Sequence, residues 1–123
     1  MIKGIILDVD GTILETLSDI KASLNIVLNE YGFKSRTYDE VRLAIGKGSK
    51  KLVEDSLPVN TDPKIIEEIA DKYLKVYGNN YNVETKPYDG IKELLNELEN
   101  KGLEPYIAIK LFPGKCFAIK SFA

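Results

Sequence analysis

Short apolar runs near the two ends of the chain, and amphipathic stretches between them, predict a mixed α/β protein. Residues 2–7 form an isoleucine-rich run that stops at Asp8, which is typical of a buried strand. The apolar residues at 106–109 predict a second buried strand. Between these runs the apolar residues recur at helical spacing, with polar residues on the opposite face. The predicted order of elements is therefore a strand, a series of helices and a second strand.

The helical periodicity divides into separate segments with recognisable ends. The predicted helices cover 19–31, 38–45, a segment beginning near Ser49, 63–77, and a segment from Ile91 that stops at Gly102. We expect Ser18 to cap the first helix and Gly32 to end it. Asp62 is expected to cap the fourth helix, whose end we predict at Gly78-Asn79-Asn80.

This order of elements predicts an α/β core that is interrupted by a helical insertion. We expect a partial doubly wound parallel-sheet core, formed by residues 1–14 and 86–123, with an inserted all-helical cap domain over 15–85. The chain would cross between core and cap in the linkers near 13–18 and 79–88.

Composition narrows the chemistry available to this chain. Its 123 residues include no histidine and one cysteine, Cys116, which excludes Ser-His-Asp hydrolysis, histidine-bound metals and an internal disulfide. An enzyme with this sequence would have to use carboxylates, hydroxyls, lysines or a hard metal ion. The N-terminal apolar run is too short for a signal peptide, and no stretch is long enough to span a membrane. We therefore expect a cytoplasmic protein with no membrane partner.

The charges are distributed unevenly along the chain. Lys and Arg number 17 and Asp and Glu 19, for a net charge of −2, and every acidic residue lies at or before Glu104. An acidic body argues against nucleic acid as a partner, because phosphate backbones are bound by clustered Lys and Arg. The residues after Glu104 carry three lysines, three of the four phenylalanines and the cysteine. This tail therefore differs in composition from the rest of the chain.

The segment Asp8-Val9-Asp10-Gly11-Thr12 carries the candidate chemistry. It begins where the first predicted strand ends, at the sheet edge where ligands bind in open α/β folds. Alternation along an extended chain places Asp8 and Asp10 on the same side. Two close carboxylates raise the pKa of one of them unless a cation joins them, and oxygen ligands on a tight loop suit Mg²⁺. One Asp could then attack phosphorus while the other transfers protons.

Two other interpretations of this segment compete with this one. A calcium-binding EF-hand loop fails on spacing, because Ile13 stands where glycine is expected and Asp19 where the final Glu is expected. A strand also precedes the segment, whereas an EF-hand needs a helix there. The other interpretation is a solvated, inert acidic turn after an edge strand, since Asp-Gly is common in turns.

Asp8–Thr12 after an apolar strand resembles the first motif of the haloacid dehalogenase superfamily of phosphatases. Further resemblance, to phosphoglycolate phosphatase-like members with a helical cap, is carried by residues 16–20, 44–49 and 87–91 and runs from about residue 2 to residue 103. It implies a Mg²⁺-dependent phosphatase of small phosphorylated metabolites that works through an aspartyl-phosphate intermediate.

The resemblance also implies roles for individual residues. Asp8 would be the nucleophile and a metal ligand, and Asp10 would be the acid/base and bind the metal through its backbone carbonyl. Gly11 and Thr12 would hold the phosphoryl group through their backbone N–H groups. Lys47 or Ser49 could contact the substrate's non-phosphate end, although both could equally belong to a solvated helix start.

The resemblance ends near residue 103. Where relatives have a strand ending in Ser or Thr, followed by Asn-Lys, this chain has Lys110-Leu111-Phe112, and the later lysine and acidic motifs have no counterpart. We interpret the tail as the product of a reading-frame change or truncation, with an authentic divergent tail as the alternative. Loss of the charged groups that the later lysine and acidic motifs supply would impair catalysis.

Two functions therefore remain open from the sequence. The chain could be a phosphatase, or a catalytically inactive fragment that keeps the cap and the first motif and acts at most as a binding or association module. In the second case the unpaired apolar faces of 91–98 and of the first strand would favour self-association.

Overall fold

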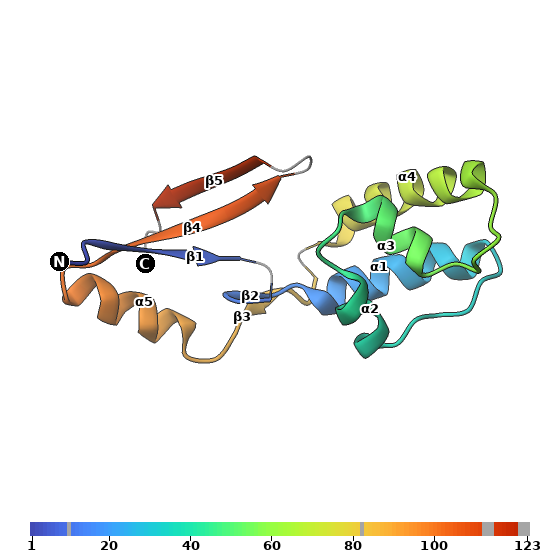
Figure 1. Cartoon of the computed structure of the whole chain (residues 1–123). Helices are drawn as coiled ribbons and strands as arrows, with labels where there is room; N and C mark the ends of the chain where they lie inside the picture. Colours follow the sequence, from blue (N-terminus) through green and yellow to red (C-terminus); the bar gives the residue numbers. More distant parts are fainter. Residues whose placement is uncertain (10, 82, 112–114, 121–123) are drawn as a thin grey trace. The chain divides into compact units, whose positions relative to one another are not determined.

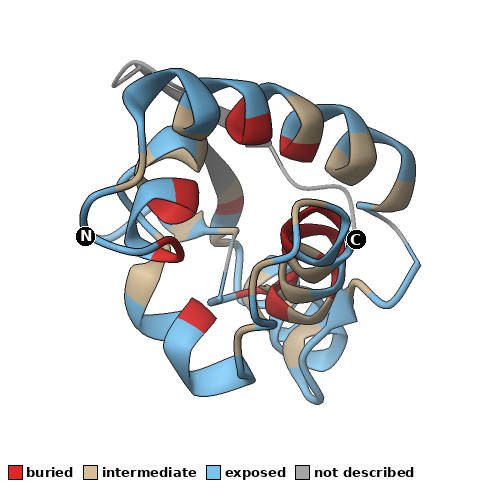
Figure 2. Cartoon of the chain, turned by 90° about the vertical axis from the view of Figure 1, so that its right-hand side faces the viewer, coloured by how far each residue is buried: buried red, intermediate tan, exposed pale blue. Residues whose placement is uncertain are grey.

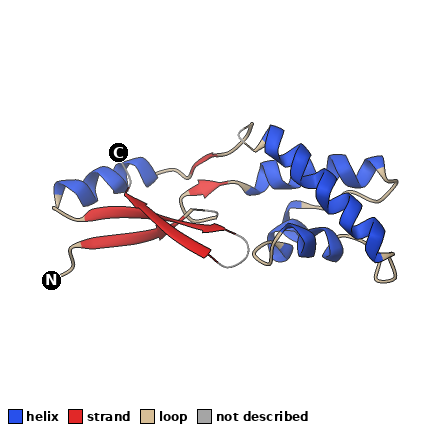
Figure 3. Cartoon of the chain, turned by 90° about the horizontal axis from the view of Figure 1, so that it is seen from above, coloured by secondary structure: helices blue, strands red, loops and turns tan. Residues whose placement is uncertain are grey.

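The computed structural model describes residues 1–9, 11–81, 83–111 and 115–120. The chain divides into two compact units. Unit 1 consists of Met1–Glu15 and Lys86–Ala123, and unit 2 of Thr16–Thr85. The described strands belong to unit 1, whereas the described part of unit 2 consists of helices and loops (Figure 3). The fold is thus α/β, with a helical unit inserted into a strand-containing one.

Unit 1 contains a sheet of three strands, in the order β1-β4-β5 (Figure 1). Strand β1 (Gly4–Asp8) pairs in parallel with β4 (Glu104–Leu111), in a register that runs from Gly4↔Glu104 to Asp8↔Ala108. Strand β5 (Lys115–Lys120) pairs antiparallel with β4. Both predicted strands are therefore present and pair as expected for an α/β core. The β5 strand was not predicted.

Two smaller elements complete unit 1. Residues Leu14–Glu15 (β2) and Lys86–Pro87 (β3) form a short antiparallel ladder, with Leu14 opposite Pro87 and Glu15 opposite Lys86. Helix α5 (Ile91–Asn100) follows β3 and precedes β4, in agreement with the helix predicted from Ile91. The β2–β3 ladder lies within segments that we predicted to be linkers.

The first strand is less buried than its composition suggested. Ile5 and Leu7 are half-buried, whereas Ile6 is 67% exposed and Asp8 is exposed as well. No residue of α5 is buried, and Leu94 on this helix is 42% exposed. The prediction of a buried first strand is thus wrong for alternate residues. Successive side chains point to opposite faces of a sheet, and one face of β1 remains largely exposed.

Unit 2 contains helices α1 (Leu17–Glu30), α2 (Tyr38–Ala44), α3 (Ser49–Asp55) and α4 (Pro63–Asn80). Helix α1 packs against α2 and α4, and α3 packs against α2 and α4. Buried residues lie on the inward sides of these helices (Figure 2). Within the described ranges, no helix is both long and apolar enough to cross a membrane.

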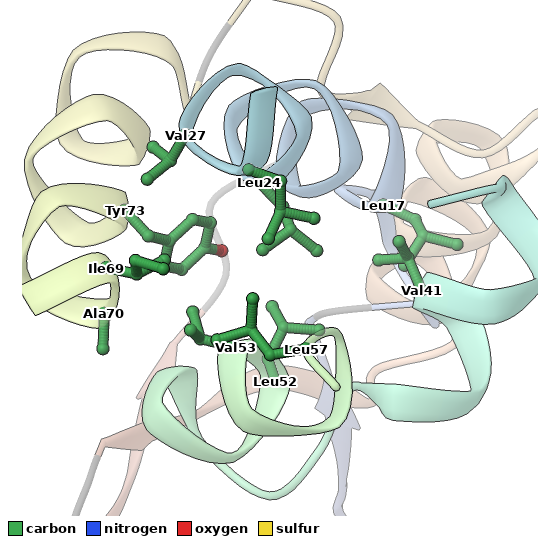
Figure 4. Close-up of a cluster of buried hydrophobic side chains, with 11 residues drawn as sticks. Leu17, Leu24, Val27, Val41, Leu52, Val53, Leu57, Ile69, Ala70 and Tyr73 are labelled. Atoms are coloured by element: carbon green, nitrogen blue, oxygen red, sulfur yellow. The ribbon is translucent and has the colours of Figure 1, made fainter. Parts of the chain in front are cut away.

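The core of unit 2 is built from apolar side chains that meet between the helices (Figure 4). Its buried members are Leu17, Leu24, Val27, Leu28, Val41, Leu52, Val53, Leu57, Ile69, Ala70 and Tyr73. Those of α1 and α4 recur at helical spacing, as the periodicity predicted. Burial of these apolar side chains is the main stabilising contribution to unit 2.

Two predicted helix ends need correction. Helix α1 begins at Leu17 with Thr16 at the N-cap position, two residues earlier than a start capped by Ser18 would place it. Helix α4 does not end at Gly78 but continues to Asn80. By contrast, Asp62 caps α4 as predicted, with its side chain accepting a 2.8 Å hydrogen bond from the Lys64 N–H.

Aromatic packing explains why α4 continues past its glycine. The rings of Tyr73 and Tyr77 stack at 5.8 Å, and those of Tyr77 and Tyr81 meet edge to face at 6.5 Å. Glycine inside a helix costs about 1 kcal/mol relative to alanine, and each aromatic pair contributes about 0.5–1.5 kcal/mol. The tyrosine series, one per helical turn, therefore offsets the cost of Gly78.

Candidate active site

Asp8 lies at the carboxyl end of β1, where that strand stops. The residue is exposed, and its Oδ1 accepts a 3.0 Å hydrogen bond from the N–H of Val9. Since β1 and β4 are parallel, the carboxyl ends of both strands lie at one edge of the sheet. This places a carboxylate at the position where open α/β sheets bind ligands.

The loop that follows Asp8 is closed by hydrogen bonds to one carbonyl. Val9 O accepts from the N–H groups of Thr12 at 3.3 Å, Ile13 at 3.0 Å and Leu14 at 3.0 Å. Ile13 is buried, and its own carbonyl accepts from the N–H of Tyr88 at 3.0 Å. The loop is thereby anchored within unit 1.

The two N–H groups predicted to hold a phosphoryl group are part of this loop. Gly11 donates to Leu14 O at 3.0 Å, with a φ of +75° that favours glycine, and Thr12 donates to Val9 O at 3.3 Å. Both residues are exposed. To bind a phosphoryl oxygen, each N–H would have to exchange its carbonyl acceptor for the ligand.

Asp10, the second predicted carboxylate, lies outside the described residues. Across the ranges that are described, no three Asp, Glu, His or Cys side chains are grouped as a metal site would require. Asp8 does fit a hard cation, because it offers exposed carboxylate oxygens at a strand end, the donor type that Mg²⁺ prefers. Asp8 would supply one ligand to the cation, and the other ligands would have to come from other groups.

The position that the family resemblance assigns to a Ser or Thr falls at the end of β4. Strand β4 extends past Ala108, the partner of Asp8, and includes Lys110 and Leu111. Phe112 lies outside the described residues. The backbone of Lys110 therefore lies two residues beyond the β4 partner of Asp8.

Lys47 and Ser49 belong to unit 2, Lys47 in the turn between α2 and α3 and Ser49 at the start of α3. Lys47 is exposed and Ser49, the first residue of α3, is half-buried. The flanking glycines have positive φ, +103° at Gly46 and +92° at Gly48, and they allow the chain to turn sharply there. Asp8, Gly11 and Thr12 thus share one loop of unit 1, whereas Lys47 and Ser49 lie in the other unit.

Sequence reasoning missed one buried carboxylate, that of Asp19 in the first turn of α1, which is 1% exposed. Burial raises the pKa of this carboxyl, but hydrogen bonds from the Thr85 hydroxyl and from the backbone N–H groups of Glu84 and Thr85 outweigh it, so the pKa lies below its usual value. A signal available in the sequence was spacing, because Asp19 lies about two helical turns before Val27, which belongs to the predicted apolar face.

Comparison with known proteins shows which family and which individual proteins this chain resembles. The family described as haloacid dehalogenase-like hydrolase matches residues 5–108. A phosphoglycolate phosphatase from Nitrosospira multiformis is 32% identical over 105 residues, which cover 82% of this chain and 46% of that protein. An N-acetylmuramic acid 6-phosphate phosphatase from Pseudomonas aeruginosa is 29% identical over 102 residues, which cover 83% of this chain and 45% of that protein.

A solved structure shares the fold. The structure of a predicted phosphoglycolate phosphatase from Haemophilus somnus superposes with a TM-score of 0.76 at 22% sequence identity, covering 86% of this chain and 50% of that one. At this identity the likeness concerns the fold alone. The chain spans about half the length of the relatives it matches.

Proposed function

The chain belongs to the family of haloacid dehalogenase-like hydrolases, and from this we propose that it is a phosphatase of small phosphorylated metabolites, with phosphoglycolate as the first candidate substrate. The observation that carries the proposal is the position of Asp8, an exposed carboxylate at the carboxyl end of a parallel strand, followed by a tight loop. Relatives named as phosphatases match the chain across this region.

In the proposed first step, a carboxylate oxygen of Asp8 attacks the phosphorus of the substrate. The bond between phosphorus and the leaving oxygen breaks as the new bond forms, and Asp10 gives its proton to that oxygen. The alcohol leaves, and the phosphoryl group remains on Asp8 as a mixed anhydride.

In the proposed second step, water hydrolyses this aspartyl-phosphate. Asp10, now a carboxylate, accepts a proton from the attacking water, and the bond between Asp8 and phosphorus breaks. Inorganic phosphate leaves, and both aspartates return to their starting states. Neither step requires histidine, in keeping with the composition of the chain.

The loop would contribute backbone N–H groups to the phosphoryl oxygens. The N–H of Thr12 makes the longest of the three bonds to Val9 O, at 3.3 Å, so it should be the easier of the two predicted donors to release. Val9 O would keep its bonds from Ile13 and Leu14, and the loop would remain closed. Gly11 would have to give up its bond to Leu14 O.

A divalent cation fits this scheme. Asp8 and Asp10 would hold Mg²⁺, which when bound supplies positive charge against the phosphoryl oxygens. In unit 2, Lys47 or Ser49 would contact the part of the substrate that is not phosphate. We infer no nucleic-acid or membrane partner for this activity, and we place the protein in the cytoplasm.

The proposal is tested by measuring phosphate release from phosphoglycolate and p-nitrophenyl phosphate, with Mg²⁺ and with excess chelator. We expect turnover that needs Mg²⁺ and falls by on the order of a thousandfold or more in Asp8→Asn. Asp89→Asn is the matched control, because Asp89 is an exposed aspartate of the same unit, and it should leave the rate unchanged. Equal rates for the chain and Asp8→Asn would contradict the proposal.

A second candidate function is that of an inactive fragment, with the helical unit and the first motif serving in binding or association. One observation favours it: α5 contains no buried residue, and Leu94 on this helix is 42% exposed. A folded, monodisperse sample that releases no phosphate from either substrate would support this function. Activity lost in Asp8→Asn would exclude it.

A further inference from the structure

Strand β1 lies at one edge of its sheet. Among the described residues the strand order is β1-β4-β5, so β1 pairs with β4 on one side and the other side is an edge (Figure 1). Proteins usually protect such an edge with charged residues, proline or a bulge. From Gly4 to Leu7, β1 contains no charged residue and no proline, and Ile6 is 67% exposed. The edge of β1 therefore lacks the usual protection against pairing with another strand.

The register of β1 on β4 shows which backbone groups point to this edge. Lys3 O accepts a 3.0 Å hydrogen bond from the N–H of Glu104, a residue of β4. The N–H and C=O groups of one residue point to the same side of a strand, and those of the next residue point to the other side. Lys3 and every second residue after it therefore face β4, whereas Gly4, Ile6 and Asp8 direct their N–H and C=O groups to the edge.

The backbone groups at the edge are complementary to a second copy of themselves. In an antiparallel pair, two facing residues of the hydrogen-bonded type exchange both of their backbone bonds. When two copies of β1 meet about a twofold axis at Ile6, Ile6 faces Ile6 of the second copy, and Gly4 faces Asp8 at either end. Each edge-directed N–H then has an acceptor and each C=O a donor, because Gly4 and Asp8 lie at equal distances from Ile6 along the strand.

Charge favours this antiparallel arrangement of two identical strands. Asp8 ends β1, and the exposed Lys3 precedes its first residue. The pairing brings the Lys3 end of one copy beside the Asp8 end of the other. It also separates the two Asp8 residues by four residues along the ladder, or about 14 Å, which exceeds the Debye length of about 8 Å at physiological ionic strength. A parallel pairing in register would place Asp8 against Asp8.

We propose that β1 pairs antiparallel with β1 of a second copy of this chain, about a twofold axis at Ile6, so that the two sheets join into one. The strand at the other edge, β5, begins and ends with lysine, which is typical of a protected edge. Gly4 faces Asp8 across the joint and has no side chain, so the pairing leaves that side of the Asp8 carboxylate uncovered. The inference holds whether or not the chain hydrolyses phosphate esters.

Amide hydrogen exchange, resolved by NMR at low and high chain concentration, tests this register directly. A ladder of this length is a small interface, so the series should extend to about 1 mM, with reducing agent present to prevent disulfides between copies. We expect the amides of Gly4, Ile6 and Asp8 to exchange about tenfold more slowly at high concentration, because the second copy supplies their acceptors. The amides of Ile5 and Leu7 face β4 and are the matched control, with rates that should not depend on concentration.

A pair of charge variants tests the position of the axis. Ile6→Lys and Ile6→Glu each place two like charges against each other, so each should raise the dissociation constant measured by sedimentation about tenfold. A one-to-one mixture of the two variants places lysine against glutamate and should return the constant to near that of the parent chain. Leu43→Lys is the control, since Leu43 is a 77% exposed leucine of unit 2, and it should leave association unchanged.

Three results would overturn the proposal. One is a parent chain that is monomeric at every concentration. Another is association without slower exchange at Gly4, Ile6 and Asp8, because the contact would then lie on another surface. The third is a mixture of the two charge variants that associates no better than either variant alone. If the variants do not fold, exchange in the parent chain decides by itself, because that measurement needs no substitution.

Discussion

Truncation of Leu24 measures how far unit 2 depends on its own core. Leu24 lies on α1 with an exposed fraction of 0%, and it belongs to the cluster to which α1, α2, α3 and α4 all contribute (Figure 4). Leu24→Ala removes buried methyl groups and leaves a cavity that rigid neighbours fill only in part. The variant should therefore unfold unit 2 at lower denaturant concentration.

The magnitude follows from this burial. Replacement of a fully buried leucine by alanine costs about 3–4 kcal/mol, the sum of lost transfer free energy and a cavity term. Small domains have a total free energy of unfolding of about 5–15 kcal/mol, so the loss is a large share. With a urea dependence of about 1–2 kcal/mol per molar, the midpoint should fall by about 2 M.

Urea titration followed by far-ultraviolet circular dichroism is the appropriate assay, because unit 2 is helical and the chain has no tryptophan. Ile26→Ala is the matched control on the same helix, since Ile26 is 44% exposed and its truncation should cost about 1 kcal/mol or less. A loss below about 1 kcal/mol for Leu24→Ala, or equal losses for both variants, would refute the reasoning.

Three further predictions concern a turn, a charge and a surface. Gly46→Ala should lower the free energy of unfolding by about 1–2 kcal/mol through backbone strain alone, because φ is +103° and a Cβ would meet no atom within 4 Å. Thermal unfolding measures this loss, and an unchanged midpoint would contradict the prediction because the turn would then relax without strain. The pKa of Asp19 is lowered in the folded chain, so its stabilising contribution is present above about pH 4 and is lost as the pH falls through the folded-state pKa. The free energy of unfolding lost in Asp19→Ala should therefore shrink in acid, and a difference independent of pH would contradict this. Leu94→Lys should reduce self-association, because Leu94 is 42% exposed on a helix without buried residues. Sedimentation velocity measures the association, and a parent chain that is monomeric at all concentrations would contradict the prediction.

The parts of the fold that depend on local periodicity could be predicted from the sequence. The starts of α2, α3 and α5 follow from apolar spacing and turn residues, and the cap at Asp62 follows from its side chain and the proline after it. The family could be inferred because Asp8 and its loop form a motif that is continuous in the sequence. These signals are all local.

The features that were missed depend on residues distant in the sequence. In the sequence, Asp19 resembles any acidic residue in the first turn of a helix, and its hydrogen-bond partners lie 65 and 66 residues away. The two-residue strands β2 and β3 are too short for any alternation to be visible. Tyr77 continues α4 beyond a glycine because of ring packing, which a local rule about glycine does not include. The exposure of alternate residues of β1 likewise depends on which elements pack against the strand, and not on the strand's own composition.

Direct detection of a phosphoryl group on Asp8 tests the central proposal most closely. The purified chain would be mixed with Mg²⁺ and phosphoglycolate, quenched in acid within the first turnover, digested and analysed by mass spectrometry. We predict that the peptide containing Asp8 gains the mass of one phosphoryl group, and that Asp8→Asn gains none. Phosphate release without any labelled peptide, or a label on a residue other than Asp8, would contradict the proposed mechanism.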